Sequence, residues 1–158
     1  RFIMSVRQAV KLVIDSAGFA QGGEVFITKM PAIRIRDLAE IMIEELAPFF
    51  GYKASDIAIE VIGSKPGEKM YEELMNSEET RRAIELKNYF AVIPAFRSIY
   101  REIDYTYPDV ISGKVTNPYN SANEEAMTRD ELRSFLVSNQ LLETDFSAVN
   151  NPAERYFP

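Results

Sequence analysis

The chain has 158 residues, of which 46% are hydrophobic and 27% are charged, a composition typical of a soluble globular domain with its own core. It contains no His and no Cys, which excludes disulfides, imidazole or thiolate metal ligands, and nucleophiles activated by a His base within this chain. The formal net charge of −6 argues against a broad basic face for nucleic acid, although a few local cations suffice for one small diphosphate. No apolar run approaches the length of a membrane span and no secretion signal is visible, so we expect a cytoplasmic setting.

The first predicted element is a helix that begins behind Ser5 and ends near Gly18. Ser5 and Gln8 have the spacing of a capping box. The apolar positions that share one face of this helix are Val6, Ala9, Val10, Val13 and Ala17. Residues 24–28 predict a short strand, and a brief extended piece after Pro31 leads into the next helix.

Residues 37–50 predict a second helix, which Gly51 ends. Its wide apolar stripe, which we expect in the core, consists of Leu38, Ala39, Met42, Ile43, Leu46 and Phe50. A second strand is predicted over residues 57–62, and a short helix over residues 69–74. Asn76 is predicted to cap a further helix that ends near Ile84.

The last part of the chain changes in character at Pro94. Residues 89–93 predict a third strand, whereas residues 95–123 are rich in aromatic and turn-forming residues and indicate an extended arm. A final helix is predicted from Arg129 to about Leu141, behind a second capping box formed by Thr128 and Glu131. This order predicts an α/β unit with too few strands for a doubly wound sheet. The chain also lacks a Gly-x-Gly-x-x-Gly turn and a Tyr-x-x-x-Lys pair.

The most informative motif is Lys65-Pro66-Gly67-Glu68, which follows the predicted strand over residues 57–62. A cation and a carboxylate flank a tight Pro-Gly turn, so one side chain can hold a phosphate while the other accepts hydrogen bonds from sugar hydroxyls. By composition alone, a plain turn with solvated charges explains the same pattern. Arg34 and Arg36 are likewise interpreted as surface charges.

Several short motifs occur in a fixed order along the chain. They are Arg1-Phe2-Ile3-Met4-Ser5, Gly22-Gly23-Glu24-Val25-Phe26, Lys29-Met30-Pro31, Asp37-Leu38-Ala39-Glu40, Lys65-Pro66-Gly67-Glu68-Lys69 with Glu72-Glu73-Leu74, Tyr119-Asn120-Ser121, and Thr128 with Glu131-Leu132. Over about residues 1–141, their order and spacing resemble the C-terminal part of nucleotide-sugar 4,6-dehydratases of polysaccharide biosynthesis, above all the UDP-N-acetylglucosamine 4,6-dehydratase group. These are extended short-chain dehydrogenases/reductases.

The resemblance implies an α/β fold, namely the C-terminal substrate-binding part of such an enzyme without its Rossmann dinucleotide-binding half. Residues 1–94 would form the nucleotide-sugar-binding domain, residues 95–141 the arm and C-terminal helix of the same domain, and residues 142–158 a tail. The full-length enzyme would hold NAD or NADP and the catalytic Tyr and Lys in its N-terminal Rossmann domain. We therefore expect this chain to be a fragment that is inactive alone, with no catalytic residue, no metal site and no bound cofactor.

Three residues carry the binding role that the resemblance implies. Arg1 would approach the nucleotide diphosphate, Lys65 would occupy a motif position where relatives usually have Arg, and Glu68 would accept hydrogen bonds from the ribose. A Lys supplies a point charge where an Arg supplies a planar fork, so Lys65 would bind the diphosphate less directionally. Alternatively, Glu68 caps the helix predicted behind it, and Arg1 lies unattached at the chain end.

The expected partners are a UDP-sugar substrate, the missing Rossmann domain and further copies in a homo-oligomer, with no nucleic acid. Without that domain we expect an exposed apolar face, self-association and a loosened arm over residues 95–123. Two other functions stay open at this point: a UDP-sugar 4-epimerase fragment, and a nucleotide-sugar-binding or assembly module without catalysis. An upstream reading frame that encodes a Gly-rich strand-turn-helix favours the enzyme, whereas a start codon near Arg1 favours the module.

Overall fold

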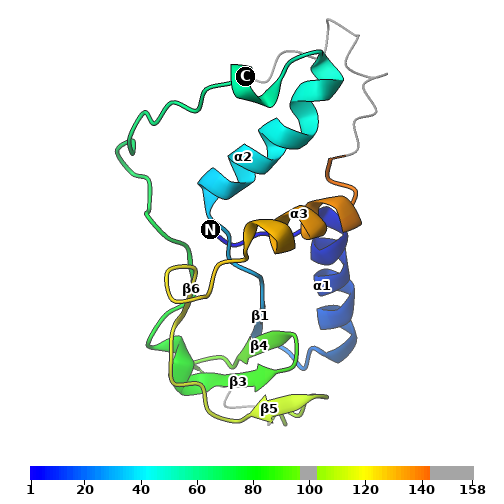
Figure 1. Ribbon diagram of the computed structural model, residues 1–158. Coiled ribbons are helices and arrows are strands. Elements are labelled where there is room, and N and C mark those ends of the chain that lie inside the picture. Colours follow the sequence, from blue (N-terminus) through cyan, green and yellow to red (C-terminus); the bar gives the residue numbers. More distant parts are fainter. Residues whose placement is uncertain (97–102, 143–158) are drawn as a thin grey trace, which may run out of the picture.

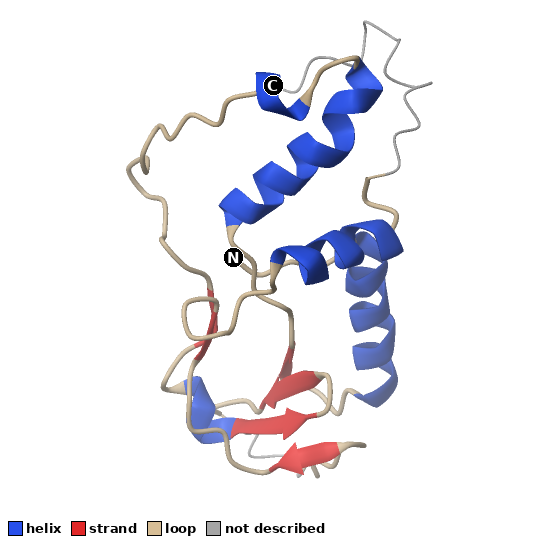
Figure 2. Ribbon diagram, viewed as in Figure 1, coloured by secondary structure: helices blue, strands red, loops and turns tan. Residues whose placement is uncertain are grey.

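The computed structural model describes residues 1–96 and 103–142, and the predicted α/β class is confirmed (Figures 1 and 2). The helices are α1 (Val6–Phe19), α2 (Ile35–Leu46) and α3 (Arg129–Ser138), with short 3-10 helices η1 (Ala47–Phe50), η2 (Ala54–Asp56) and η3 (Glu79–Arg82). The strands are β1 (Val25–Thr28), β2 (Glu73–Met75), β3 (Ala83–Leu86), β4 (Tyr89–Val92), β5 (Val110–Ser112) and β6 (Tyr119–Asn120).

Two small antiparallel sheets organise the chain. Four strands follow the order β1-β4-β3-β5, and a separate pair joins β2 to β6. The central strand β4 is buried along its whole length because it has neighbours on both sides, with Phe26 opposite Ala91 and Ile84 opposite Ala91. Figure 1 shows α1 beside this sheet, while α2 and α3 lie together at the other end of the molecule.

The core consists of three clusters of buried side chains. The largest fills the space between the two sheets and includes Ile27, Met75, Ala83, Phe90, Val92 and Tyr119. A second cluster joins α2 to α3 through Ile41 and Leu132, both of which have no exposed surface. The third lies where Leu12 and Phe19 of α1 pack against the sheet.

Both predicted capping boxes are confirmed. At α1, the backbone N–H of Gln8 donates to the Ser5 hydroxyl (3.3 Å), and that of Ser5 donates to the Gln8 side chain (2.8 Å). At α3, Thr128 and Glu131 make the same exchange. Backbone and hydroxyl hydrogen bonds from Thr128 hold the pKa of Glu131 below its ordinary value. Both helix starts were therefore predictable, because each depends on four consecutive residues.

The strand predicted over residues 57–62 is wrong. These residues belong to no strand, and none of the hydrogen bonds among the described residues involves the backbone of residues 58–62. A strand requires a hydrogen-bonded partner strand, and a run of β-branched residues does not specify that partner.

The two predicted helices that follow are also corrected. Residues 69–74 form no helix; Glu73–Met75 is β2, which pairs with β6 about forty-five positions later in the chain. Asn76 does cap a turn, because its side chain accepts from the backbone of Glu78 and Glu79, but only η3 follows, and β3 begins at Ala83. Long-range pairing and burial of Ala83 and Leu86 (each 3% exposed) outweigh a weak local helix preference.

The predicted apolar stripes of α1 and α2 are only partly buried by the rest of the described chain. In α1, Val6, Val10 and Val13 are 79%, 53% and 65% exposed. In α2, the buried residue is Ile41, while Met42 of the predicted stripe is 41% exposed. Leu38 of the predicted α2 stripe does pack against the second cluster, so the stripe is covered in part, while Met42 and the exposed valines of α1 remain open to solvent.

The predicted arm is more regular than expected. It contains β5 and β6, which pair with β3 and β2, although residues 97–102 lie outside the described part of the chain. Of the predicted tail, residues 143–158 also lie outside it. In the described ranges, no helix is both long and apolar enough to cross a membrane.

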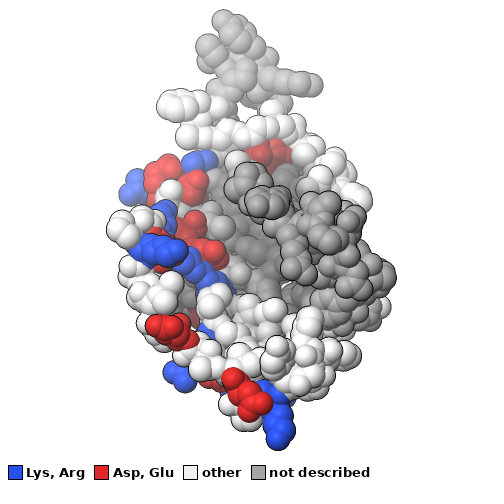
Figure 3. Space-filling model, turned by 90° about the horizontal axis from the view of Figure 1, so that it is seen from above, with Lys and Arg blue, Asp and Glu red and all other residues white. Residues whose placement is uncertain are grey.

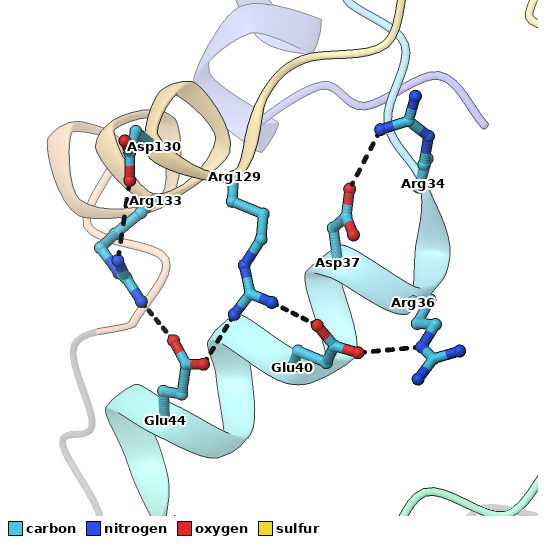
Figure 4. A network of polar contacts seen from close by, with 8 residues as sticks. All are labelled: Arg34, Arg36, Asp37, Glu40, Glu44, Arg129, Asp130 and Arg133. Carbon is cyan, nitrogen blue, oxygen red and sulfur yellow. Dashed lines mark hydrogen bonds and ion pairs between the residues drawn. The ribbon is translucent and has the colours of Figure 1, made fainter.

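A network of charged side chains joins α2 to α3 (Figure 4). The guanidinium of Arg129 lies between Glu40 and Glu44, with 2.6 Å to the Glu44 carboxylate, and Arg133 contacts Glu44 and Glu45. Figure 3, which views the molecule from above, shows positive and negative side chains interleaved on the visible surface. Arg34 and Arg36 pair with Asp37 and Glu40 of α2 and are exposed, as predicted.

The network makes stability depend on pH. Arg36, and then Arg129, hold the pKa of Glu40 below its ordinary value. A carboxylate with a lowered pKa in the folded state stabilises the protein above its unfolded-state pKa, and this contribution disappears as pH falls through the folded-state pKa. We expect Glu40→Gln to lower the melting temperature by a constant amount between about pH 7 and 5.5, and by progressively less as the pH falls below the ordinary pKa of a Glu side chain. An unchanged difference at acidic pH would contradict this assignment.

Candidate functional site

The Lys65-Pro66-Gly67-Glu68 motif forms a closed turn, called here the 65–68 turn. The backbone N–H of Glu68 donates to the carbonyl of Lys65 (3.1 Å), and Gly67 has a φ of 90°. Pro at the second position and Gly in the left-handed region at the third are the requirements of a type II turn. The sequence therefore specifies this turn locally.

The Glu68 carboxylate caps its own turn. Its Oε2 accepts a hydrogen bond from the backbone N–H of Lys65 (2.9 Å). The alternative that Glu68 caps a following helix is wrong, because no helix follows. Both charged side chains are exposed, so the ammonium of Lys65 and the remaining acceptor positions of Glu68 are open to solvent.

Arg1 is held by backbone and side-chain contacts, so the alternative that it lies unattached is also wrong. Its terminal amine donates to the carbonyl of Ile33 (2.8 Å), and the N–H of Ile33 donates back to Arg1 (2.7 Å). Its guanidinium Nη2 donates to the carbonyl of Lys69 (2.7 Å), one residue past the 65–68 turn. Residues 1 and 69, far apart in sequence, therefore meet at the base of that turn.

Glu72 and Ser121 anchor this base to the body of the protein. The backbone N–H of Glu72 donates to the Ser121 hydroxyl (2.9 Å), and that of Ser121 donates to the Glu72 carbonyl (2.8 Å). The Glu72 carboxylate accepts from the N–H of Phe2 (3.0 Å) and lies 3.8 Å from the Arg1 guanidinium. Glu72 thus links the N-terminal segment, the turn segment and the β2–β6 pair.

Tyr119 completes the anchor from inside the core. Its hydroxyl accepts from the N–H of Met30 (2.7 Å) and donates to the carbonyl of the same residue (2.9 Å). Its ring stacks on Phe2 with 4.8 Å between centroids, and burial raises the pKa of its hydroxyl. Ring stacking therefore fixes the apolar part of the Tyr119 side chain, and hydrogen bonds fix its hydroxyl group.

The sequence motif contains two of the three predicted site residues, Lys65 and Glu68. The sequence did not reveal that Glu72, Tyr119 and Ser121 hold the base of their turn. Tyr119-Asn120-Ser121 and Glu72-Glu73-Leu74 were visible as motifs, but their contact across β2 and β6 was not. Within residues 1–96 and 103–142, no cluster of three or more acidic residues could hold a metal ion.

The arrangement offers both cations and hydrogen-bond acceptors. Positive charge comes from Lys65 and Lys69 and from the Arg1 guanidinium, which contacts the Lys69 backbone, and Glu68 supplies acceptor oxygens. Such a set can bind an anion that also carries hydroxyl groups. It is therefore a candidate binding site.

Comparison with known proteins defines the class of this fold. The X-ray structure of Pen from Bacillus thuringiensis matches 91% of this chain and 39% of its own, with a TM-score of 0.75 and 39% sequence identity. The chain has the α/β architecture of part of an extended short-chain dehydrogenase/reductase. The family described as "Polysaccharide biosynthesis protein" matches residues 1–94, and the chain belongs to this family.

Three relatives show what the family contains. A Methanocaldococcus jannaschii protein named as an uncharacterized membrane protein is 44% identical and matches 86% of this chain and 37% of its own. A UDP-N-acetylglucosamine 4,6-dehydratase (inverting) of Campylobacter jejuni is 32% identical, over 67% of this chain and 28% of its own. A UDP-glucose 4-epimerase of Rickettsia felis is 31% identical, over 87% of this chain and 38% of its own. The chain thus spans well under half the length of these relatives, which include nucleotide-sugar dehydratases and epimerases.

The hydrogen bonds between the Tyr119 hydroxyl and the Met30 backbone predict that removal of this hydroxyl lowers the stability of the protein. Tyr119→Phe leaves the partly buried N–H and carbonyl of Met30 without their partner, and a lost hydrogen bond of this kind typically costs about 1 kcal/mol or more. We expect this decrease in the free energy of unfolding in urea. Tyr52→Phe, at a residue that is 62% exposed, is the matched control and should change it by less than about 0.5 kcal/mol. Equal effects of the two substitutions would contradict the anchor.

Proposed function

We propose that this chain is the substrate-binding part of a nucleotide-sugar 4,6-dehydratase of the UDP-N-acetylglucosamine type, acting in polysaccharide or capsule biosynthesis. The observation that carries the proposal is the 65–68 turn, which presents Lys65 and Glu68 to solvent from a base tied to Arg1. The named dehydratase among the relatives supports the substrate class. Arg1 and Lys65 would bind the diphosphate, and Glu68 would accept hydrogen bonds from the ribose hydroxyls.

The hydrogen bond from Lys65 to Glu68 supports this assignment of roles. One carboxylate oxygen is used by the backbone N–H of Lys65, which orients the group and leaves its other acceptor positions for two neighbouring hydroxyls. The ammonium of Lys65 is exposed and the guanidinium of Arg1 is partly exposed, so both cations are accessible to a diphosphate beside the turn.

A second candidate function is a UDP-sugar 4-epimerase, which the longer match to the Rickettsia epimerase favours. Both activities need a redox cofactor, and the NAD or NADP of the full-length enzyme would be supplied by the domain outside this chain. Product analysis with the full-length enzyme separates the two. A dehydratase yields a product that has lost one water, whereas an epimerase yields an isomer of the substrate.

The binding roles predict a specific pattern of affinities for the full-length protein. In calorimetry with UDP-N-acetylglucosamine, Lys65→Ala and Glu68→Ala should each weaken binding about tenfold or more, about 1.4 kcal/mol. Lys65→Arg should retain binding, because Arg keeps the charge and adds a planar fork. Glu68→Gln keeps an acceptor for the Lys65 N–H and should weaken binding because the charge is lost.

Lys53→Ala is the control, since Lys53 is an exposed cation outside the turn. If Lys53→Ala and Lys65→Ala weaken binding equally, the effect is one of general charge and the proposed site is wrong. If neither Lys65→Ala nor Glu68→Ala changes the affinity, the turn does not bind the nucleotide sugar.

The exposed stripe of α1 supports the proposal that a further domain covers this chain in the full-length enzyme. Val6, Val10 and Val13 would be buried against that domain, and in its absence their exposed side chains should drive association.

We expect the 158-residue chain to self-associate in sedimentation velocity, to lack NAD binding, and to turn over no UDP-sugar. Val10→Lys should shift it toward monomer, whereas Arg7→Lys, elsewhere on the same helix, should not. A monodisperse monomer of the unsubstituted chain would contradict this.

A further inference from the structure

Of the two cations assigned to the diphosphate, Arg1 is the one whose charged group is held in place by the described part of the chain. Its guanidinium Nη2 donates to the carbonyl of Lys69 (2.7 Å), and its Nη1 lies 3.8 Å from Oε1 of Glu72. The exposed ammonium of Lys65, by contrast, makes no hydrogen bond or ion pair with the described residues. The two cations therefore differ in how far they are oriented before a ligand binds.

Glu72 is itself held by contacts that leave one carboxylate oxygen facing Arg1. Its Oε2 accepts a hydrogen bond from the backbone N–H of Phe2 (3.0 Å), and its Oε1 is the oxygen nearest the guanidinium. Its backbone exchanges two hydrogen bonds with Ser121, of 2.9 and 2.8 Å. A residue fixed at its backbone and at one carboxylate oxygen can hold the group that its other oxygen faces.

The contacts of Arg1 restrict the plane of its guanidinium without using all of its donors. A guanidinium carries five N–H groups in one plane, and the carbonyl of Lys69 takes one of them. The 3.8 Å to Glu72 is longer than a hydrogen bond, so the hydrogens of Nη1 stay available to phosphate oxygens. Restricting a flexible side chain in advance reduces the entropy that is lost when a ligand binds.

The negative charge of Glu72 has an opposite effect on an anionic ligand. Through charge alone, this carboxylate would weaken diphosphate binding, and its neutralisation would strengthen binding. The side chains of Arg1 and Glu72 are 33% and 44% exposed, so water screens this repulsion. Orientation and charge therefore predict opposite signs for the same substitution.

We propose that Glu72 is a positioning residue, whose carboxylate orients the Arg1 guanidinium for the diphosphate of the nucleotide. This role rests on the proposed function, because Arg1 is taken there to bind the diphosphate. The fixed orientation of Arg1, in addition to its charge, then contributes to the affinity for ligands that carry phosphate. Glu72 should accordingly affect the binding of UDP and not that of uridine.

Calorimetry with the full-length protein tests this role, with UDP titrated directly and uridine measured by displacement. Glu72→Gln removes the charge but keeps an oxygen that can accept from the N–H of Phe2. We expect it to weaken UDP binding about three- to tenfold and to change uridine binding by less than about twofold. Glu73→Gln is the matched control, because it makes the same charge change at an exposed neighbour, and it should leave both affinities within about twofold.

A double-mutant cycle tests whether Glu72 acts through Arg1. In an Arg1→Ala background, Glu72→Gln should no longer weaken UDP binding. Arg1→Lys, which keeps the charge but loses the planar group, leaves the hydrogen bonds of Glu72 to Phe2 and Ser121 in place. We expect it to weaken UDP binding about as much as Glu72→Gln does.

Tighter UDP binding by Glu72→Gln would overturn the proposal, because the carboxylate would then act only as an opposing charge. An equal loss for UDP and uridine, or a loss that persists without Arg1, would overturn it too, because Glu72 would then act through the fold of the turn. If Arg1→Ala leaves UDP binding unchanged while Lys65→Ala weakens it, the positioning role is wrong and the proposed UDP site stands. If Arg1→Ala, Lys65→Ala and Glu68→Ala all leave it unchanged, the proposed function is wrong as well.

Discussion

The β2–β6 pair and the contact between Glu72 and Ser121 are the interactions on which the candidate site depends. They join residues about fifty positions apart and place the base of the 65–68 turn against the folded body. The Glu72 carboxylate then reaches Phe2 and Arg1, so the N-terminal segment is tied to the same point. Without this junction, the turn would be an independent loop and Arg1 would have no reason to lie beside it.

The junction is stable because its polar groups are satisfied and its apolar groups are buried. Met75 and Tyr119 face each other across the strands, with 0% and 5% of their surfaces exposed. The Tyr119 hydroxyl satisfies both backbone groups of Met30, which would otherwise lack partners beside the core. A short pair of strands, weak alone, thus gains its stability from the cluster beneath it.

Features that depend on neighbouring residues were predictable from the sequence. The capping boxes at Ser5 and Thr128 and the Pro-Gly turn at residues 65–68 belong to this group, because each is specified within four residues. Features that depend on distant partners were not. The strand β2 was predicted as helix because its partner Tyr119 lies far along the chain, and residues 57–62 were predicted as a strand although they pair with no strand among the described residues.

The same distinction applies to the candidate site. Lys65 and Glu68 were found from the motif and the family resemblance, and family membership is confirmed, whereas Glu72 and Ser121 act through contacts that no local pattern reveals. The apolar stripe of α2 was predicted to lie in the core, but Met42 is 41% exposed, and Val6, Val10 and Val13 of the α1 stripe are exposed as well. Their exposure fits a chain whose matched relatives are much longer.

A crystal structure of the full-length protein with UDP bound would test the central claim most directly. The account predicts the diphosphate oxygens within hydrogen-bond distance of the Lys65 ammonium or the Arg1 guanidinium, and the ribose hydroxyls on the Glu68 carboxylate. UDP bound elsewhere, with the 65–68 turn pointing into solvent and its charged groups without contacts, would contradict it.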